Sequence, residues 1–463
     1  MLIPSKEIDG FRDKCGVVGI YGSPQAAHRV YLALHALQHR GQDSAGIVSC
    51  HKDTFHRAVG LGLVSDIFNE DILKKLPGFM AVGHVRYTTA GSHSINDAQP
   101  MSTKTGNGYL TIAHNGNIVN ASVLKDRLTH EGAIFHAQSD TEVICHLFAK
   151  SRHDDPISCL RDALEKVHGA YSLCLLINDT LVGVRDPFGV RPLFLGKLDQ
   201  GYVLASEDCS FALINARTVR EIEPGEIIVI DKMGVRSFDL IDRGKVRPAP
   251  CIFEHIYFAR PDSHLFGHSV YRTRKNLGAE LAKEAPVDAD VVIAVPDSGV
   301  LAAMGYAQAL QIPYDIGLVR NHYVGRTFIE PDDKIRHFGV RLKLSPVREV
   351  IDQKRLVVVD DSIVRGTTSQ KIVSLLRNAG AKEIHLRISA PMTKHPCHYG
   401  IATPTKEELI ASSMSPQEIA EFLGVESLAY VSLEGMYRAL SKNKISMCDA
   451  CFTGVYPINP EAR

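Results

Sequence analysis

The chain has 463 residues, with 52 lysines and arginines against 52 aspartates and glutamates, so its formal net charge is zero. A neutral chain lacks the positive charge typical of nucleic-acid-binding proteins, and we expect no nucleic-acid partner. No stretch approaches about 18 continuous apolar residues, so no membrane span and no membrane partner are predicted. Hydrophobic residues make up 45% and charged residues 22% of the chain, which is typical of a globular protein.

The first 14 residues, MLIPSKEIDGFRDK, are charged and have no apolar core, so they do not resemble a secretory signal. The chain has ten cysteines. Without an export signal, these predict free thiols, metal ligands or a nucleophile rather than disulfides. We therefore expect a cytoplasmic protein.

From Cys15 to about residue 240, short apolar segments alternate with turns. Few long crossovers separate these segments, so they predict a largely antiparallel sheet. They read CGVVGIYG, AGIVSC, YLTIAHNGNIV, AYSLCLLIND, TLVGVRDP and GYVLASED. Two further segments, AAHRVYLALHALQHR and SDTEVICHLFAK, have the i, i+3, i+4 apolar spacing of helices.

After about residue 250 the order becomes strand, loop, helix. ADVVIAVP leads through DSG into VLAAMGYAQAL, and KRLVVVDD leads through SIVRG into TTSQKIVSLLRNAG and then KEIHLRISA. This repetition predicts a parallel sheet with crossover helices. The proline-containing stretch 244–250 predicts a domain boundary. Between 405 and 440, KEELIASS, PQEIAEFLG and LEGMYRALS predict a helical tail.

The segment LVVVDDSIVRGTTS is the most specific motif of the chain. Asp360 and Asp361 follow a predicted buried strand, at the end where open α/β sheets bind ligands. Gly366 allows close approach of a ligand, and Thr367 and Thr368 with a helix N-terminus can hold a phosphate. Adjacent carboxylates suit ribose hydroxyls or Mg²⁺. The alternative is a strand that ends in a helix cap with surface aspartates.

This motif resembles the signature with which type I phosphoribosyltransferases bind 5-phosphoribosyl 1-pyrophosphate (PRPP). The resemblance implies that Asp360 and Asp361 contact the ribose hydroxyls. It also implies that a run of loop residues holds the 5′-phosphate: Ile363, Val364, Arg365, Gly366, Thr367 and Thr368. PDSG at 296–299 is similar to the pyrophosphate loop of that family, which implies that Ser298 joins the two aspartates around Mg²⁺ and PRPP.

Between these motifs lies the basic, glycine-interrupted stretch 320–344. It is either an ordinary surface loop or a lid that neutralises the leaving pyrophosphate and excludes water. Exclusion of water would protect the activated ribose from hydrolysis.

Cys15 precedes a predicted strand, where a cysteine is usually a core residue. Four motifs accompany it: LQHRGQDSAG at 37–46, HVRY at 84–87, HNGN at 114–117 and SDTE at 139–142. Together these resemble the N-terminal-nucleophile glutamine amidotransferases over roughly residues 15–240.

The resemblance implies a role for each of five residues. Cys15 attacks the side-chain amide of glutamine, Arg86 pairs with its α-carboxylate and Asp140 with its α-ammonium. Asn115 and the N–H of Gly116 form the oxyanion hole. An amine at the N-terminus has a pKa of about 7.7–8.0 and can accept the thiol proton. The nitrogen of Cys15 has that property only after Met1–Lys14 is removed, so we expect residues 1–14 to be a propeptide rather than a frayed terminus.

CDAC at 448–451 could be a redox pair, half of a zinc site or a coincidence, and its spacing leaves zinc and iron–sulfur open. Some amidophosphoribosyltransferases carry a 4Fe-4S cluster on four cysteines with a similar layout. That resemblance implies a cluster on Cys251, Cys397, Cys448 and Cys451. We expect the other cysteines to be core thiols: Cys50, Cys145, Cys159, Cys174 and Cys209.

The order of these motifs resembles the amidophosphoribosyltransferase family along almost the whole chain. The resemblance implies an α+β N-terminal-nucleophile sandwich with αββα layers over 15–245. An α/β type I phosphoribosyltransferase domain with a parallel sheet, the helical tail and the cluster cysteines would follow over 246–463.

The implied reaction converts PRPP, glutamine and water to 5-phosphoribosylamine, glutamate and pyrophosphate, the first committed step of de novo purine synthesis. Closure of the lid would build a passage for ammonia. Feedback inhibition by purine nucleotides and a homo-oligomer, dimer or tetramer, are also implied. Two alternatives are another glutamine-dependent synthase and a non-catalytic PRPP-binding regulator. The PRPP motif argues against the first, and the amidotransferase residues argue against the second.

Overall fold

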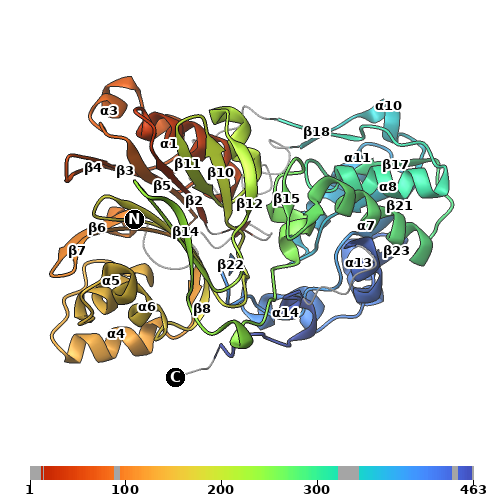
Figure 1. Ribbon diagram of the computed structural model, residues 1–463. Coiled ribbons are helices and arrows are strands. Elements are labelled where there is room, and N and C mark those ends of the chain that lie inside the picture. Colours follow the sequence, from red (N-terminus) through yellow and green to blue (C-terminus); the bar gives the residue numbers. More distant parts are fainter. Residues whose placement is uncertain (1–11, 14, 88–93, 322–343, 441–446, 461–463) are drawn as a thin grey trace.

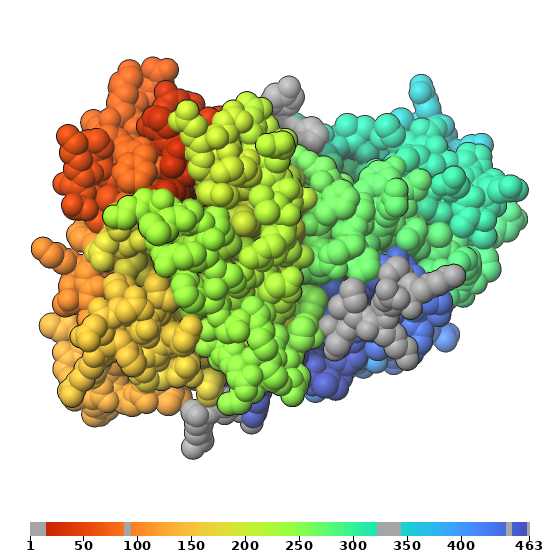
Figure 2. Space-filling model, in the orientation of Figure 1, coloured from red at the N-terminus to blue at the C-terminus, as the bar shows by residue number. Residues whose placement is uncertain are grey.

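The computed structural model describes residues 12–13, 15–87, 94–321, 344–440 and 447–460. Two halves lie side by side in the molecule, as the red-to-green and green-to-blue parts of Figure 2 show. No helix in these ranges is long and apolar enough to cross a membrane.

The first half contains two antiparallel sheets that face each other (Figure 1). One sheet has the order β12 (Arg217–Glu221), β10 (Phe194–Leu198), β11 (Gly201–Ala205), β2 (Cys15–Tyr21), β5 (Met80–Arg86), β3 (Ser44–His51), β4 (Thr54–Leu61). The other has the order β14 (Gly234–Asp239), β13 (Glu226–Asp231), β9 (Thr180–Arg185), β8 (Gly169–Ile177), β7 (Gly108–Ile118), β6 (Met101–Thr105). The predicted antiparallel arrangement is confirmed.

Apolar side chains from both sheets meet in a core between them, including Val17 and Val82 from one sheet and Leu176 and Ile228 from the other. The short helices α2 (Val64–Ile67) and α3 (Glu70–Lys74) follow β4. Helix α1 (Ala26–Ala36) packs on the outer face of the first sheet. Three helices cover the outer face of the second: α4 (Ala121–His130), α5 (Thr141–Lys150) and α6 (Pro156–Leu164). The layers therefore have the predicted order αββα.

The second half is built on a parallel sheet with the order β17 (Val291–Ala294), β20 (Arg355–Asp360), β21 (Glu383–Ile388), β23 (Ser427–Tyr430). Leu356 to Val359 of β20 are buried, as suits a central parallel strand. Among its described residues, this half has the helices α7 (Val270–Glu284), α8 (Val300–Leu310), α10 (Arg348–Ile351), α11 (Thr367–Asn378), α12 (Pro416–Leu423), α13 (Leu433–Leu440) and α14 (Ala450–Thr453). The predicted α/β architecture is confirmed.

Three two-stranded pairs complete the described part: β15 (His264–Leu265) with β16 (His268–Ser269), β18 (Leu318–Arg320) with β19 (Leu344–Pro346), and β1 (Arg12–Asp13) with β22 (Ile401–Ala402). The last pair joins the segment before Cys15 to the second half. In Figure 1, β22 lies at the junction of the two halves.

The tail differs from the prediction of helices alone. Residues 406–408 and 410–412 form short 3₁₀ turns, and residues 427–430 form strand β23 between α12 and α13. The four residues of β23 are all half-buried, without the alternation of buried and exposed residues that marks a strand in the sequence. These residues form a strand because they pair in parallel with β21, a contact that the local sequence does not indicate.

The halves are joined by buried charges. Arg40 and Arg191 of the first half both bond Glu254 of the second, with N–O distances of 2.7 and 3.0 Å, and Arg40 also bonds Glu207. All four side chains are fully buried. Each carboxylate has a guanidinium partner, so these charges are compensated in the interior.

Candidate active sites

Cys15 is buried and is the first residue of β2, the central strand of the first sheet. Its register partner across the antiparallel pair with β5 is Arg86. The motif at 37–46 packs against the same arginine, because the N–H of Asp43 donates to the Arg86 carbonyl at 2.9 Å. A Cβ on Gly41 would lie 2.6 Å from the Arg86 nitrogen, so only glycine permits this approach. The structure thus brings together the predicted nucleophile and the predicted carboxylate-binding residue.

The guanidinium of Arg86 lies 3.8 Å from the carboxylate of Asp97. Asp97 accepts hydrogen bonds from the N–H groups of Gln138 and Ser139, at 2.8 and 3.0 Å. Asp97 therefore connects Arg86 to the loop that leads to Asp140. The sequence did not single out Asp97, because nothing in its local pattern distinguishes it from a surface aspartate.

Asn115 and Gly116 lie near the end of β7, in the sheet that faces β2. The Asn115 side chain is fully buried, and neither of its amide atoms has a hydrogen-bond partner among the described residues. A buried amide without a partner is costly in a folded protein and commonly marks a functional site. The resemblance predicts that this amide donates to an oxyanion.

Asp140 lies just before α5, and its carboxylate accepts the N–H of Ile118 at 2.8 Å. This bond fixes the aspartate beside the end of β7, two residues from Gly116. The adjacent His114 bonds Thr141 through Nδ1 at 3.1 Å, while its backbone N–H donates to Gln99 at 2.8 Å. Two of the motifs, HNGN and SDTE, therefore meet at the end of β7.

Beneath them, His84 Nε2 lies 2.9 Å from the carbonyl oxygen of His114. Burial lowers the pKa of His84 to about 3, so the ring is neutral and donates from Nε2. The histidine of HVRY thus holds the backbone of the HNGN motif at His114.

In the second half, both predicted ligand loops lie at the carboxyl edge of the parallel sheet. The N–H of Val295 donates to the Val359 carbonyl at 2.9 Å. A Cβ on Gly299 would lie 2.3 Å from the same carbonyl oxygen. The loop with Ser298 therefore packs directly against the end of β20, beside Asp360.

Asp360 and Asp361 are largely buried, and the Asp361 N–H donates to the Asp360 carboxylate at 2.9 Å. Ser362 donates to Asp361 at 2.5 Å. Gly366 has φ +81° and directly precedes α11. Its left-handed backbone lets the chain turn directly from residues 362–365 into α11, whose first two residues are Thr367 and Thr368.

Arg365 of this loop bonds Glu408 at 2.9 Å. Ile363 and Val364 are buried, so their contribution to a phosphate site would come from the backbone. Residues 322–343, which make up most of the predicted lid, lie outside the described residues.

The four predicted cluster cysteines lie on segments that are distant in sequence but adjacent in the fold. Cys251 and Cys448 form a β-bridge, and the Cys448 N–H donates to the Pro250 carbonyl at 2.8 Å. The N–H groups of Lys394 and His395 donate to the Cys451 carbonyl at 3.0 and 3.1 Å, which brings in the segment with Cys397.

Burial chiefly raises the pKa of Cys251 to about 12, and Cys397 is close enough to add to the rise. Burial, followed by Cys251, raises the pKa of Cys448 and of Cys451 well above the usual value. None of the ten cysteines forms a disulfide in the structure.

Within the described ranges, no three cysteine, histidine or acidic side chains form a group that could hold one metal ion. A four-iron cube is wider than one ion, so its ligands need not converge on a single point. The thiol-only chemistry of the four cysteines suits iron–sulfur ligation.

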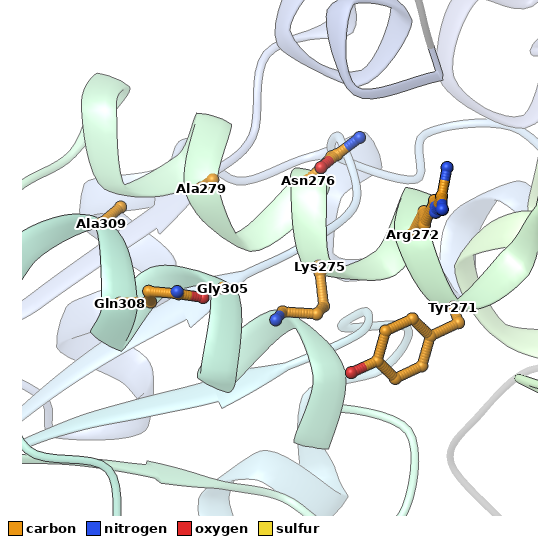
Figure 3. Close-up of a pocket in the computed structure, with 8 residues that line it drawn as sticks. All are labelled: Tyr271, Arg272, Lys275, Asn276, Ala279, Gly305, Gln308 and Ala309. Atoms are coloured by element: carbon orange, nitrogen blue, oxygen red, sulfur yellow. The ribbon is translucent and has the colours of Figure 1, made fainter.

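A hollow of about 370 Å³ lies between α7 and α8 (Figure 3). Tyr271, Arg272, Lys275 and Asn276 line it from α7, and Gly305 and Gln308 from α8. None of its lining residues belongs to the predicted sites, and no carboxylate or thiol lines it. We assign no part of the chemistry to it.

Comparisons with known proteins agree with both halves. A family model described as a glutamine amidotransferase domain matches residues 84–212, and one described as a phosphoribosyl transferase domain matches residues 270–399. The chain is 53% identical over 452 residues to the chloroplastic amidophosphoribosyltransferase of Glycine max, covering 97% of this chain and 79% of that protein. It is 46% identical over 458 residues to the amidophosphoribosyltransferase of Bacillus subtilis (strain 168), covering 97% and 95%.

A solved structure gives the same result. The glutamine PRPP amidotransferase from B. subtilis, complexed with ADP and GMP, matches with a TM-score of 0.91 at 46% identity. The match covers 96% of this chain and 98% of that one.

Proposed function

The chain belongs to the amidophosphoribosyltransferase family, and from this premise we propose how its own residues carry out the reaction. The enzyme transfers the amide nitrogen of glutamine to PRPP and catalyses the first committed step of purine biosynthesis. The residue roles below are proposals. The register of Cys15 with Arg86 is the observation that carries them.

In the first half, the Cys15 sulfur attacks the side-chain carbonyl carbon of glutamine. Arg86 grips the α-carboxylate and Asp140 the α-ammonium. Asn115 and the Gly116 N–H stabilise the oxyanion, each donor contributing about 3 kcal/mol. Collapse of the tetrahedral intermediate expels ammonia and leaves a thioester, which water hydrolyses to glutamate.

The base for Cys15 is its own α-amine once residues 1–14 have been removed. In the uncleaved chain Arg12–Asp13 pair with Ile401–Ala402, so removal of residues 1–14 would break this pairing. Mass spectrometry of active enzyme tests it. The expected first residue is Cys15, and full activity with Lys14 still attached would contradict the proposed base.

In the second half, Asp360 and Asp361 hold the ribose hydroxyls, and the loop from Ile363 to Thr368 holds the 5′-phosphate. Ammonia attacks C1 of the ribose and pyrophosphate leaves. Mg²⁺, held by Ser298, Asp360 and Asp361, would neutralise charge on the pyrophosphate. The position of the Ser298 loop against β20 supports this donor set.

We also propose a 4Fe-4S cluster on Cys251, Cys397, Cys448 and Cys451. Their shared neighbourhood and thiol-only chemistry support it. A bound cluster would tie the tail to the start of the second half and act as a structural group. Anaerobically purified protein should show the charge-transfer absorbance of such a cluster, with about four iron and four sulfide per chain. A colourless protein with zinc in place of iron would reject it.

Purine nucleotides are proposed as feedback inhibitors, because the similar B. subtilis enzyme was solved with ADP and GMP. Titration of pyrophosphate release with each nucleotide would test this. A dimer or tetramer is proposed from the family resemblance, and sedimentation equilibrium would measure it.

We propose a cytoplasmic location. Ten cysteines without a disulfide among them suit a reducing compartment. The Glycine max relative named above is chloroplastic, so fractionation of the native source is the test.

The residue roles in the first half are tested most simply by labelling. An electrophilic glutamine analogue should modify Cys15 alone and abolish glutamine-dependent activity, while ammonia-dependent activity persists. Labelling of another cysteine, with Cys15 unmodified, would reject Cys15 as the nucleophile.

A further inference from the structure

A loop of the second half packs directly on the proposed oxyanion hole of the first. We propose that Gly400 is a positioning residue for Gly116, so that the second half completes the glutamine site. This inference rests on the proposed role of Gly116.

The contact is between backbones. A Cβ on Gly400 would lie 3.1 Å from the Gly116 Cα and 3.2 Å from its carbonyl carbon. At these distances one of the two backbone segments must move by a few tenths of an ångström to admit even a methyl group. Gly400 also has φ +114°, a conformation that favours glycine.

Gly116 is confined from its other side as well. A Cβ there would lie 1.9 Å from the Ala170 carbonyl oxygen on β8, and its φ is +149°. The Gly116 peptide is therefore held between β8 and Gly400. The direction of its N–H depends on both neighbours.

A hydrogen bond reinforces this contact. The Asn117 side-chain amide donates to the His398 carbonyl at 2.9 Å, across 281 residues of sequence. Successive residues of β7, Gly116 and Asn117, thus touch the same loop, His398–Gly400.

The loop itself is firmly held. Tyr399 is buried, its hydroxyl bonds the Ile458 carbonyl, and the Ile458 N–H donates back to that hydroxyl at 3.0 Å. The His398 ring packs edge-on against Tyr456, with ring centroids 5.0 Å apart. A loop anchored in this way can transmit its position to Gly116.

Oxyanion stabilisation depends strongly on donor geometry, because misplacement by a fraction of an ångström weakens the bond formed in the transition state. Gly400→Ala should therefore lower glutamine-dependent kcat by about tenfold or more, with KM for glutamine nearly unchanged. Ammonia-dependent pyrophosphate release should be unaffected, because it bypasses the oxyanion.

Gly234→Ala is the matched control. Gly234 has a similar φ of +101°, but a Cβ there would meet nothing within 4 Å. The control should keep both activities. Asn117→Ala removes the side-chain hydrogen bond to the His398 carbonyl and should lower glutamine-dependent kcat in the same selective way. Asn117→Ala also tests the inference if Gly400→Ala fails to fold.

The inference is overturned if neither Gly400→Ala nor Asn117→Ala changes the ratio of glutamine- to ammonia-dependent kcat relative to Gly234→Ala. Equal loss of both activities would also overturn it, since that indicates a structural role alone. Asn115→Ala separates this failure from failure of the proposed site. If Asn115→Ala impairs glutamine use and Gly400→Ala does not, only the present inference is wrong. If Asn115→Ala has no effect, the proposed oxyanion hole is wrong.

Discussion

Cys15 and Arg86 are register partners on adjacent antiparallel strands, although 71 residues of sequence separate them. Directly opposite residues in such a pair have Cβ atoms about 4.5–5.5 Å apart. A substrate whose carboxylate is held by Arg86 is therefore close to the Cys15 sulfur. The sheet, rather than a flexible loop, sets the distance between the two ends of the glutamine site.

Arg86→Lys tests this relationship. Lysine keeps the charge but cannot grip a carboxylate bidentately, so KM for glutamine should rise about 10- to 100-fold. Steady-state kinetics with glutamine and, separately, with ammonia would measure this, and the ammonia reaction should be unchanged. Arg29→Lys, at an arginine that bonds the Ile214 carbonyl away from the site, is the control. An unchanged KM in Arg86→Lys would remove Arg86 from the substrate site.

Asp361→Asn addresses the second site. Loss of one carboxylate from the pair should lower kcat/KM for PRPP at least about 100-fold, because a charge-assisted contact to the sugar or Mg²⁺ is removed. Hydrolysis of glutamine by the first half should continue. Asp290→Asn is the matched control, since Asp290 bonds Arg355 at the opposite end of β20. Normal PRPP turnover in Asp361→Asn would contradict the assignment.

The buried charges between the halves predict a large effect on stability. Although burial alone would raise the pKa of Glu207, Arg40 and His39 hold it well below its usual value. Glu254→Gln leaves Arg40 and Arg191 with one carboxylate fewer in a fully buried site, and should lower the free energy of unfolding by about 3–5 kcal/mol. Urea denaturation measures this. Asp239→Asn, in an exposed ion pair, should change it by less than about 0.5 kcal/mol. Equal effects would show that the network is not what joins the halves.

A buried histidine predicts how stability depends on pH. His255 is fully buried, and neither ring nitrogen has a hydrogen-bond partner among the described residues. Burial, helped by His268 and Arg274, lowers its pKa to about 3. The unfolded chain takes up this proton below about pH 6.5 and the folded chain does not. Stability should therefore fall by about 1.4 kcal/mol per pH unit between pH 6.5 and 3 for this group.

His255→Phe removes this titratable group. The melting temperature of the variant should therefore fall less steeply between pH 6.5 and 4.5 than that of the wild type. Phenylalanine suits a site beside the ring of Phe266, whose centroid lies 5.8 Å away. The exposed His51→Phe is the control. Parallel melting curves for wild type and His255→Phe would show that His255 does not contribute to acid sensitivity.

Local pattern predicted the elements that carry the chemistry. One short stretch, residues 357–366, contains the three valines of the strand, the two aspartates and the glycine before α11. The loop and the residues that determine its shape can therefore be recognised together in the sequence. The short strand β23 was missed because its strand conformation depends on pairing with β21 and not on a local sequence pattern. Asp97 and Gly400 were missed because their significance lies in contacts with Arg86 and Gly116, which only the folded chain brings together. The register of Cys15 with Arg86 likewise depends on tertiary pairing, although the resemblance named both residues.

The central claim is that one chain both releases ammonia from glutamine and places it on the sugar. The direct test is to measure glutamate and pyrophosphate together, in anaerobically purified enzyme and in Cys15→Ala, with glutamine or ammonia as nitrogen source. We expect equal amounts of glutamate and pyrophosphate from glutamine in the wild type, and pyrophosphate from ammonia alone in Cys15→Ala. Failure of the wild type to release pyrophosphate with either nitrogen source would contradict it.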